Sequence, residues 1–556
     1  MGKMLAQATE KSPQRAILKN IGLDDEALSK PLVAVITSSV ELAGGRALLE
    51  LEKTVSAGIR EGGGTPVSLP CSGFFADFTK GTAGAKYALP SRELAADSVE
   101  AILVSQMFEG AVLISGEAES LAGMTMGAVR ANIPFIVLPS GPMNSSIVKG
   151  KKAGLSDVEE MACAMKAGKC SEDDLKKLED NALNGSGMQN GLLHGNSLMC
   201  ALEALGLSLP KAATAPASSG ERNRIAFQSG KKIVQLLTED VRPKMILSRE
   251  SFTNAITVLS SINTATSAVI DLIAIAAECN IELSLDHLQA IATKTPLLVK
   301  LVPDSQLDMS DFHSAGGVTA LMAQLASNEL ISVDCRTVML DRVSKVIENV
   351  EVLNADVIHK MESPISKRGS FTLLKGNLAE DGAIIKTAGY ERKNSVFKGK
   401  AVCFNSEEDA VYAINSGDIK EESVIVIRYE GPIGGPGMRE LSSACSAING
   451  KELAGKVAII TDGRLPGNEK GFNVGCISPE AAAGGKLAIV NNGDTIKIDL
   501  VNYKVDVDVP MKELLARGKK YHPKANTSTD LLLRYSTLCL PSFLGAGMKK
   551  NPKNSR

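Results

Sequence analysis

Short apolar runs alternate with amphipathic stretches over the first 140 residues of the chain. The runs are rich in β-branched residues, as expected of buried strands, and they lie at 32–36, 66–69, 111–114 and 134–138. Between them, apolar residues recur with helical spacing at 47–60, 91–108 and 121–131. Strands that alternate with helices in this way predict an α/β fold with a doubly wound parallel sheet.

The pattern changes twice further along the chain. Helical spacing dominates next and predicts helices at 159–166, 172–181, 193–205, 225–237, 252–278 and 285–292. Short strands dominate the last third, at 401–404, 424–428, 457–460, 487–490, 495–500 and 504–509, with a hairpin turn at 491–494. The stretch ESPISKR (362–368) is the predicted linker. We therefore expect an α/β N-terminal domain over 1–366 and a mostly-β C-terminal domain over 367–556.

Composition excludes several classes of protein. The chain has 556 residues, too many for one core, and a net charge of −2 with 4% aromatic residues and no Trp. No basic or base-stacking surface for nucleic acid is indicated. The ten cysteines are scattered without a CxxC pair, which disfavours a disulfide scaffold or zinc ribbon and fits a reducing cytoplasm. The N-terminus lacks an apolar signal core, and the most apolar helix, 268–277, is too short to cross a membrane. We expect a soluble, cytoplasmic protein.

A glycine-rich loop follows the strand predicted at 424–428. Its sequence, EGPIGGPG (430–437), forbids both helix and strand pairing, and a helix is predicted from Met438 onward. Such a loop leaves bare backbone N–H groups that can approach an anion or a small polar ligand. We expect Gly435 and Gly437 to face the substrate; the alternative is an ordinary strand-to-helix turn that serves as scaffold.

Several motifs, in order and spacing, identify a family. They are LPSRE (89–93), NIPFIVLPSGPM (132–143), EALGLSLP (203–210), RYEGPIGGPGMRE (428–440), TDGR (461–464) and SPEAAAGG (478–485). Over nearly its whole length the chain resembles the dihydroxy-acid dehydratase and phosphogluconate dehydratase family. The resemblance implies a homodimer and a barrel-like C-terminal domain. It also implies a site in loops 37–46, 70–88 and 115–122, where the family holds an iron–sulfur cluster, a magnesium ion and a base serine.

The residues at the family's functional positions differ in this chain. By position, the two main cluster cysteines become Glu117 and Gln189, and a third, present in some members, becomes Gly45. The remaining departures are Ser72 and Ala118 for metal aspartates, Glu119 for a carbamylated lysine, Pro466 for the base serine and Cys476 for a histidine; Glu440, a metal ligand in the family, is retained. Carboxylate and amide groups do not replace the thiolates of an iron–sulfur cluster. The substitutions therefore predict a divergent member that has lost the cluster.

Two hypotheses follow. In the first, the protein is a lyase-type enzyme with a rewritten active site, which acts on a small hydroxy acid or amino-acid-like ligand by cluster-independent chemistry. Its predicted residues are Glu117, Glu119 and Glu440 for catalysis, Glu440 and Glu119 for a magnesium ion, and Ser72, Gln189, Arg92, Arg464, Gly435 and Gly437 for substrate. In the second, the protein is an inactive pseudoenzyme with a binding, assembly or regulatory role.

A conventional hydro-lyase acting on a 2,3-dihydroxy acid or a sugar acid is a further alternative. His194 is the histidine nearest the presumed site and is interpreted as structural, and Cys71 and Cys476 are interpreted as packed thiols.

Overall fold

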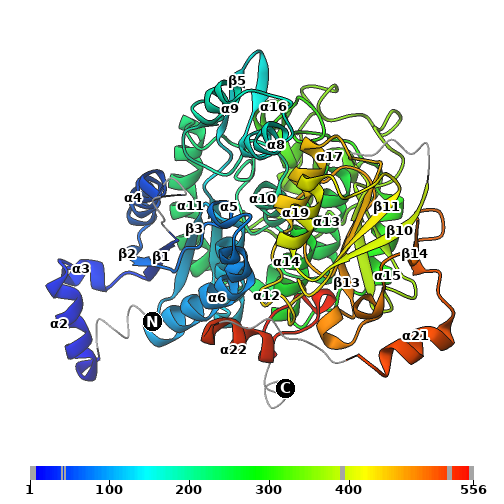
Figure 1. Ribbon diagram of the computed structural model, residues 1–556. Coiled ribbons are helices and arrows are strands. Elements are labelled where there is room, and N and C mark those ends of the chain that lie inside the picture. Colours follow the sequence, from blue (N-terminus) through cyan, green and yellow to red (C-terminus); the bar gives the residue numbers. More distant parts are fainter. Residues whose placement is uncertain (1–7, 39–41, 43–44, 389–394, 522–528, 550–556) are drawn as a thin grey trace.

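The computed structural model describes residues 8–38, 42, 45–388, 395–521 and 529–549 (Figure 1). Residues 1–7, part of the N-terminal stretch on which the expected cytoplasmic location was based, lie outside the described residues, as do residues 39–41 and 43–44 of the loop predicted at 37–46. Among the helices described, none combines the length and apolar character needed to cross a membrane.

The N-terminal half is built on a parallel sheet of four strands in the order β2-β1-β3-β4. Its strands are β1 (Leu32–Thr37), β2 (Thr65–Pro70), β3 (Gly110–Ser115) and β4 (Phe135–Pro139), and its main helices are α4 (Gly45–Glu61), α6 (Ala88–Ser105), α7 (Ala118–Ala131) and α11 (Gly220–Thr238). Right-handed crossovers place α4 on one face, where it packs with α11, and α6 and α7 together on the other. The predicted doubly wound sheet is confirmed.

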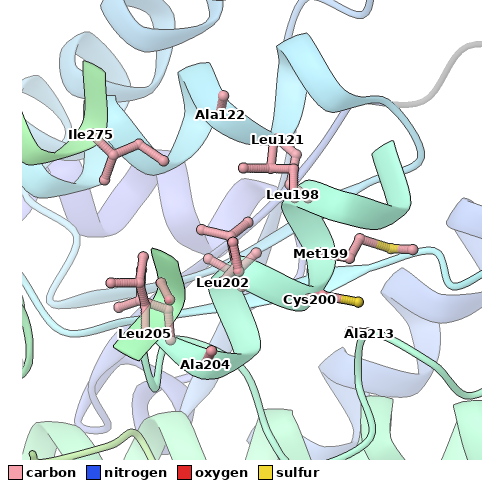
Figure 2. Packing of buried hydrophobic residues seen from close by; sticks show 14 of the residues in the cluster. Leu121, Ala122, Leu198, Met199, Cys200, Leu202, Ala204, Leu205, Ala213 and Ile275 are labelled. Carbon is pink, nitrogen blue, oxygen red and sulfur yellow. The ribbon is translucent and has the colours of Figure 1, made fainter. Parts of the chain in front are cut away.

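The helical middle of the chain encloses a buried helix, α10 (His194–Ala204). Its apolar side chains pack beside α7 and α14 (Ser267–Glu278), where Leu198, Leu202 and Leu121 lie close together (Figure 2). The single helix predicted at 252–278 is in fact two, α13 (Arg249–Ser261) and α14, because Ile262 is extended and bridges to Val299. Close packing on most sides fixes α10, and with it the side chain at its first position.

A small insertion, which we call the excursion, follows β4 of the first sheet. It consists of a three-stranded sheet in the order β6-β5-β7 and two helices; the bounds are β5 (Asn144–Val148), β6 (Lys151–Ala153), α8 (Leu155–Lys166), α9 (Glu172–Glu179) and β7 (Leu183–Asn184). The helix α8 packs on α20 (Ser442–Gly450) of the second half, so the excursion connects the two halves of the molecule.

The C-terminal half contains an eight-stranded mixed sheet in the order β15-β14-β10-β11-β12-β13-β9-β8. Its strands are β8 (Phe371–Leu374), β9 (Gly382–Lys386), β10 (Val396–Phe404), β11 (Ser423–Ile427), β12 (Ala458–Thr461), β13 (Asn473–Ser478), β14 (Thr495–Asp499) and β15 (Lys504–Val507). A bridge between Lys375, just after β8, and Lys504 brings the two edges together, so the sheet is nearly closed. The predicted barrel-like domain is confirmed.

Some predicted elements of this half are wrong. The run at 487–490 is a 3₁₀ helix, η5 (Lys486–Ile489), so the turn at 491–494 does not join two strands. The helix predicted from Met438 begins only at Ser442, and the sequence did not predict β8, β9, β13 or α19 (Glu407–Ser416). The predicted domain boundary at 366 lies just before β8 and stays a prediction.

The remaining helices lie mostly at the periphery (Figure 1). Their bounds are α2 (Ser12–Asn20), α3 (Asp25–Leu28), α5 (Ala76–Thr79), α12 (Pro243–Ile246), α15 (Leu285–Lys294), α16 (Met309–Ser314), α17 (Gly317–Ala326), α18 (Val343–Val346), α21 (Met511–Gly518) and α22 (Asp530–Leu538). Of these, the short helix α5 matters most for function because it follows β2 at the site described next.

Candidate active site

A cavity of about 230 Å³ lies at the carboxyl ends of the first sheet's strands. Segments that follow β2, β3 and β4 line it, together with the start of α10 and two residues of the C-terminal half, Glu440 and Pro466. The strand order reverses between β1 and β3, and open α/β sheets bind ligands at such a reversal. Of the three loops predicted to form the site, 70–88 and 115–122 contribute lining residues.

The cavity has an apolar part and a polar part. The apolar side chains are those of Phe75, Phe78, Met143, Leu155, Leu183, Met188 and Leu193. The polar and charged ones are those of Asp77, Lys80, Glu117, Glu119, Gln189, His194, Asn196 and Glu440. An apolar cavity with a few convergent polar groups is the usual form of a small-molecule site.

Glu117 occupies the turn between β3 and α7. Its backbone N–H donates to Ser115 Oγ at 3.1 Å, which shapes the turn, and its Oε2 accepts from the backbone N–H of Ala76 at 3.4 Å. Burial, followed by the nearby charges of Asp77 and Glu119, raises the pKa of Glu117 well above its ordinary value. The surroundings of Glu117 therefore favour the protonated form of its carboxyl group.

A buried chain of charges runs behind the cavity. The His194 imidazole lies between two carboxylates, with Nε2 2.6 Å from Asp271 Oδ2 and Nδ1 3.1 Å from Glu440 Oε1. Arg464 Nη2 donates to Glu119 Oε1 at 3.2 Å, and Arg464 Nη1 lies 3.9 Å from Glu440 Oε1. The predicted convergence of Glu119, Glu440 and Arg464 is therefore what the structure contains, with His194 added.

The contacts of this chain set its charges. Burial opposes the charge on His194, but Glu440 and Asp271 outweigh it and raise the pKa of His194 to about 10. Burial also opposes ionisation of Glu440, but His194 and Arg464 outweigh it and lower the pKa of Glu440 to about 2. The pKa of Glu440 is thus lowered and that of Glu117 raised, although both are carboxyl groups of one cavity.

A second polar group lies on the opposite side, on and after α5. Lys80 Nζ contacts Asp77 Oδ1 at 2.8 Å and Glu159 Oε1 at 3.7 Å, and Gln189 Nε2 donates to Asp77 Oδ2 at 2.7 Å. Sequence reasoning assigned the loop to the site but chose Ser72 within it. The signal it missed is the pair Asp77 and Lys80, two opposite charges three residues apart in the loop that follows β2.

Other predicted site residues lie away from the cavity lining. Ser72 is exposed on the loop after β2. Arg92 is fully buried on α6, where its guanidinium donates to Asp271 Oδ1 at 3.0 Å, to Glu93 and to the carbonyl of Gly545. The contacts of Arg92 are therefore with the protein itself.

The glycine-rich loop also uses its backbone internally. The N–H groups of Ile433 and Gly434 both donate to the Glu480 carboxylate, at 2.9 Å in each case. Gly435 donates to the carbonyl of Gly431, and a Cβ on Gly437 would lie 1.6 Å from the Lys86 carbonyl oxygen. A carboxylate of the chain thus takes the place expected for a bound anion, and the loop is packed as scaffold.

The cavity can be compared with the groups that the family resemblance implies. An iron–sulfur cluster needs thiolates, and the side chains that line the cavity, all in the described part of the chain, include no cysteine. Cys71 and Cys476 are buried outside the lining, and burial raises the pKa of each thiol. Within the described ranges, no group of three or more His, Cys, Asp or Glu side chains is arranged to hold a metal ion. The lining residues therefore fit neither an iron–sulfur cluster nor a magnesium ion.

Comparisons with known proteins cover the whole chain. Residues 30–346 and 356–546 match the family models described as Dihydroxy-acid/6-phosphogluconate dehydratase N-terminal and C-terminal. Relatives named dihydroxy-acid dehydratase include those of Pyrococcus abyssi, 42% identical over 98% of both chains, and Acetivibrio thermocellus, 41% identical over 97% of both. Another, from Ruminiclostridium cellulolyticum, is 38% identical over 98% of this chain and 99% of its own.

These comparisons correct two predictions. The prediction of a divergent or inactive protein is contradicted. Relatives that align over nearly the full length are all named dihydroxy-acid dehydratase and point to conventional dehydration. The prediction that no cluster is bound is contradicted too, because the enzyme so named belongs to the family for which the resemblance implies an iron–sulfur cluster. For the cofactor, the comparisons and the cavity-lining side chains thus point in different directions.

Proposed function

Because the chain belongs to the dihydroxy-acid/6-phosphogluconate dehydratase family, we propose that it is a lyase that removes water from a small 2,3-dihydroxy acid in this cavity. One observation supports the choice of a diol. Two oxygens of cavity-lining residues, Glu119 Oε2 and Asn196 Oδ1, are buried without a hydrogen-bond partner among the described residues. Buried acceptors without partners are costly, and the hydroxyl groups of a ligand would satisfy them.

The rest of the cavity suits the rest of such a substrate. The Lys80 ammonium is the one cationic side chain on the α5 side of the described lining, and it supplies donors for a carboxylate. In the same cavity, Phe75, Met188 and Leu193 offer apolar surface for a hydrocarbon side chain. These contacts support an aliphatic acid more than a sugar acid, whose additional hydroxyl groups would meet apolar atoms.

Dehydration breaks the C2–H and C3–O bonds of the substrate: the C2 proton passes to the Glu440 carboxylate, the C3 hydroxyl leaves as water, and the enol so formed takes a proton at C3 from water to give a 2-oxo acid. A hydroxyl group leaves more readily as water, and the protonated Glu117 carboxyl group lies in the cavity to donate that proton. Glu119 and Glu440 are assigned to hold the substrate hydroxyls, and the chain of charges behind them keeps their positions fixed.

The experiment is to incubate the purified protein with an aliphatic 2,3-dihydroxy acid and, separately, with a sugar acid, and to measure the 2-oxo acid formed. Both the protein as purified and protein reconstituted without oxygen with iron and sulfide are assayed, because the relatives point to a cluster. Formation of a 2-oxo acid from the aliphatic substrate by either preparation supports the proposal. No product from either preparation would refute it.

The resemblance also implies a homodimer, and we keep this as part of the proposal. Light scattering coupled to size exclusion should then give twice the mass of the 58.4 kDa chain. The expected location in the cytoplasm stays a prediction.

A further inference from the structure

His194 occupies the first position of α10 and faces the cavity, where sequence reasoning interpreted it as structural. Its side chain is 8% exposed. Both ring nitrogens are engaged, Nε2 with Asp271 Oδ2 at 2.6 Å and Nδ1 with Glu440 Oε1 at 3.1 Å; Glu119 Oε1 lies 3.7 Å from Nδ1. The ring thus links a carboxylate behind the cavity to one that lines it.

Asp271 is itself held from behind. It lies on α14 with no exposed surface, and its second oxygen accepts from Arg92 Nη1 at 3.0 Å. Arg92 is fixed in turn by Glu93 and by the carbonyl of Gly545. Because α14 packs against α10, both ends of the Asp271–His194 hydrogen bond are carried by buried helices. A group supported in this way has little freedom to rotate.

Glu440 has no comparable support from its own segment. It lies in the irregular stretch between the glycine-rich loop and α20, where a backbone bridge joins it to Arg464. Arg464 Nη1 is 3.9 Å from Glu440 Oε1, farther than a hydrogen bond. The nearest charged partner of the Glu440 carboxylate among the described residues is His194, and the Ser267 side chain at the start of α14 adds a hydrogen bond.

We infer that His194 is a positioning residue, which orients the Glu440 carboxylate toward the substrate hydroxyl, and that Asp271 and Arg92 act through it. The inference rests on the proposed function, in which Glu440 accepts a hydrogen bond from the substrate. It also gives the buried Arg92 a role at a distance, in place of the direct substrate contact predicted for it.

Two variants of His194 separate its contacts. His194→Asn places an amide near the position of Nδ1 and keeps a donor for Glu440, whereas His194→Gln places one near Nε2 and keeps only the contact with Asp271. We expect the loss of kcat in His194→Gln to be at least tenfold greater than in His194→Asn. In His194→Gln, KM should change less than kcat does. Equal losses in the two variants, or a greater loss in His194→Asn, would show a merely structural residue. Thermal denaturation of both variants checks that their folds are equally stable.

A crystal structure of His194→Gln gives an answer that needs no turnover. The inference expects the Glu440 carboxylate to leave its present position, while in His194→Asn it stays; an unmoved carboxylate in both variants overturns the inference. If the wild-type protein forms no 2-oxo acid while Glu440 moves as expected, the proposed function fails and the positioning role stands. The two failures are thus distinguishable.

Discussion

At the scale of single residues, the cavity is defined by carboxyl groups placed in opposite environments. Burial and the neighbouring charges of Asp77 and Glu119 outweigh the nearby Lys80 and raise the pKa of Glu117. Glu440 lies against His194 and Arg464, so it stays ionised. One sequence contains both groups, and only the contacts made after folding assign them different protonation states.

The first prediction concerns Glu117. Glu117→Gln keeps the shape of the side chain but cannot donate the proton, so kcat should fall by about 10²-fold or more, with little change in KM. In the wild-type protein kcat should fall as pH rises through the raised pKa of Glu117, and the variant should lack this decrease. Steady-state rates of 2-oxo acid formation across pH measure both.

Glu203→Gln is the matched control for this variant. Glu203 is another buried glutamate with a raised pKa, but it accepts hydrogen bonds from the backbone of Lys211 and Ala213, away from the cavity. Its substitution should leave kcat within about threefold of wild type. A similar loss in both variants would show that Glu117 acts only through folding.

The residues that line the cavity could be predicted only in part from the sequence. Glu117, Glu119 and Glu440 were identified because they occupy positions of family motifs. Lys80 and His194 match no motif, and their place at the cavity depends on how α5 and α10 meet the C-terminal half. Such contacts between distant segments leave no local pattern in the chain.

At the scale of elements, the glycine-rich loop was predicted correctly in its backbone but wrongly in the group that it binds. The glycines do free the backbone, and its N–H groups do meet an acceptor. The acceptor is the Glu480 carboxyl group, which follows β13 and is 47 residues away in sequence. The pairing of β11 with β12 and of β12 with β13 brings these two segments together, and the sequence alone does not reveal it.

The second prediction tests the loop as a packed element. Gly437 has φ of +96°, and a Cβ there would lie 1.6 Å from the Lys86 carbonyl oxygen. Gly437→Ala should therefore lower the free energy of unfolding by more than about 3 kcal/mol. The control is Gly484→Ala, at φ of +86° with no atom within 4 Å of the added Cβ, which should cost only about 1–2 kcal/mol. Denaturant unfolding measures the free energy of unfolding of both variants. An equal decrease in the two would show that the loop shifts to accommodate the added methyl group.

At the scale of the whole molecule, the two halves could be predicted to different degrees. The first sheet was predictable because β1, β3 and β4 are fully buried and appear as continuous apolar runs. In the second half, β8 and β9 are short strands that pair with each other, and the other partner of β9 is β13, far along the chain, so no local pattern predicts this part of the sheet. The cavity lies between the halves, so its full lining could not be deduced from either alone.

The third prediction concerns the pH dependence of stability. Burial is the main cause that raises the pKa of Asp462 to about 6, of Glu407 and Glu469 to about 7, and of Glu480 to about 8. A raised pKa in the folded state favours the protonated form, so its stabilisation is complete below the unfolded pKa and is lost as pH rises through the folded one. His194, with a pKa raised to about 10, acts in the same direction above its ordinary pKa of 6.5.

The free energy of unfolding should accordingly fall by at least a few kcal/mol between pH 5 and pH 8.5. Glu480→Gln removes one titrating group but keeps an acceptor for the loop, so its decline should be shallower. Differential scanning calorimetry at a series of pH values measures the effect. A Tm that is constant or rises over this range in the wild-type protein would contradict the assignment of these buried acids.

The most direct test of dehydration in this cavity is a proton NMR time course of an aliphatic 2,3-dihydroxy acid with the protein in D₂O. The account predicts that the substrate signals disappear while a 2-oxo acid forms that carries solvent deuterium at C3, because the enol must take its new hydrogen from water. An unchanged substrate spectrum, with protein as purified and after reconstitution with iron and sulfide, would contradict it.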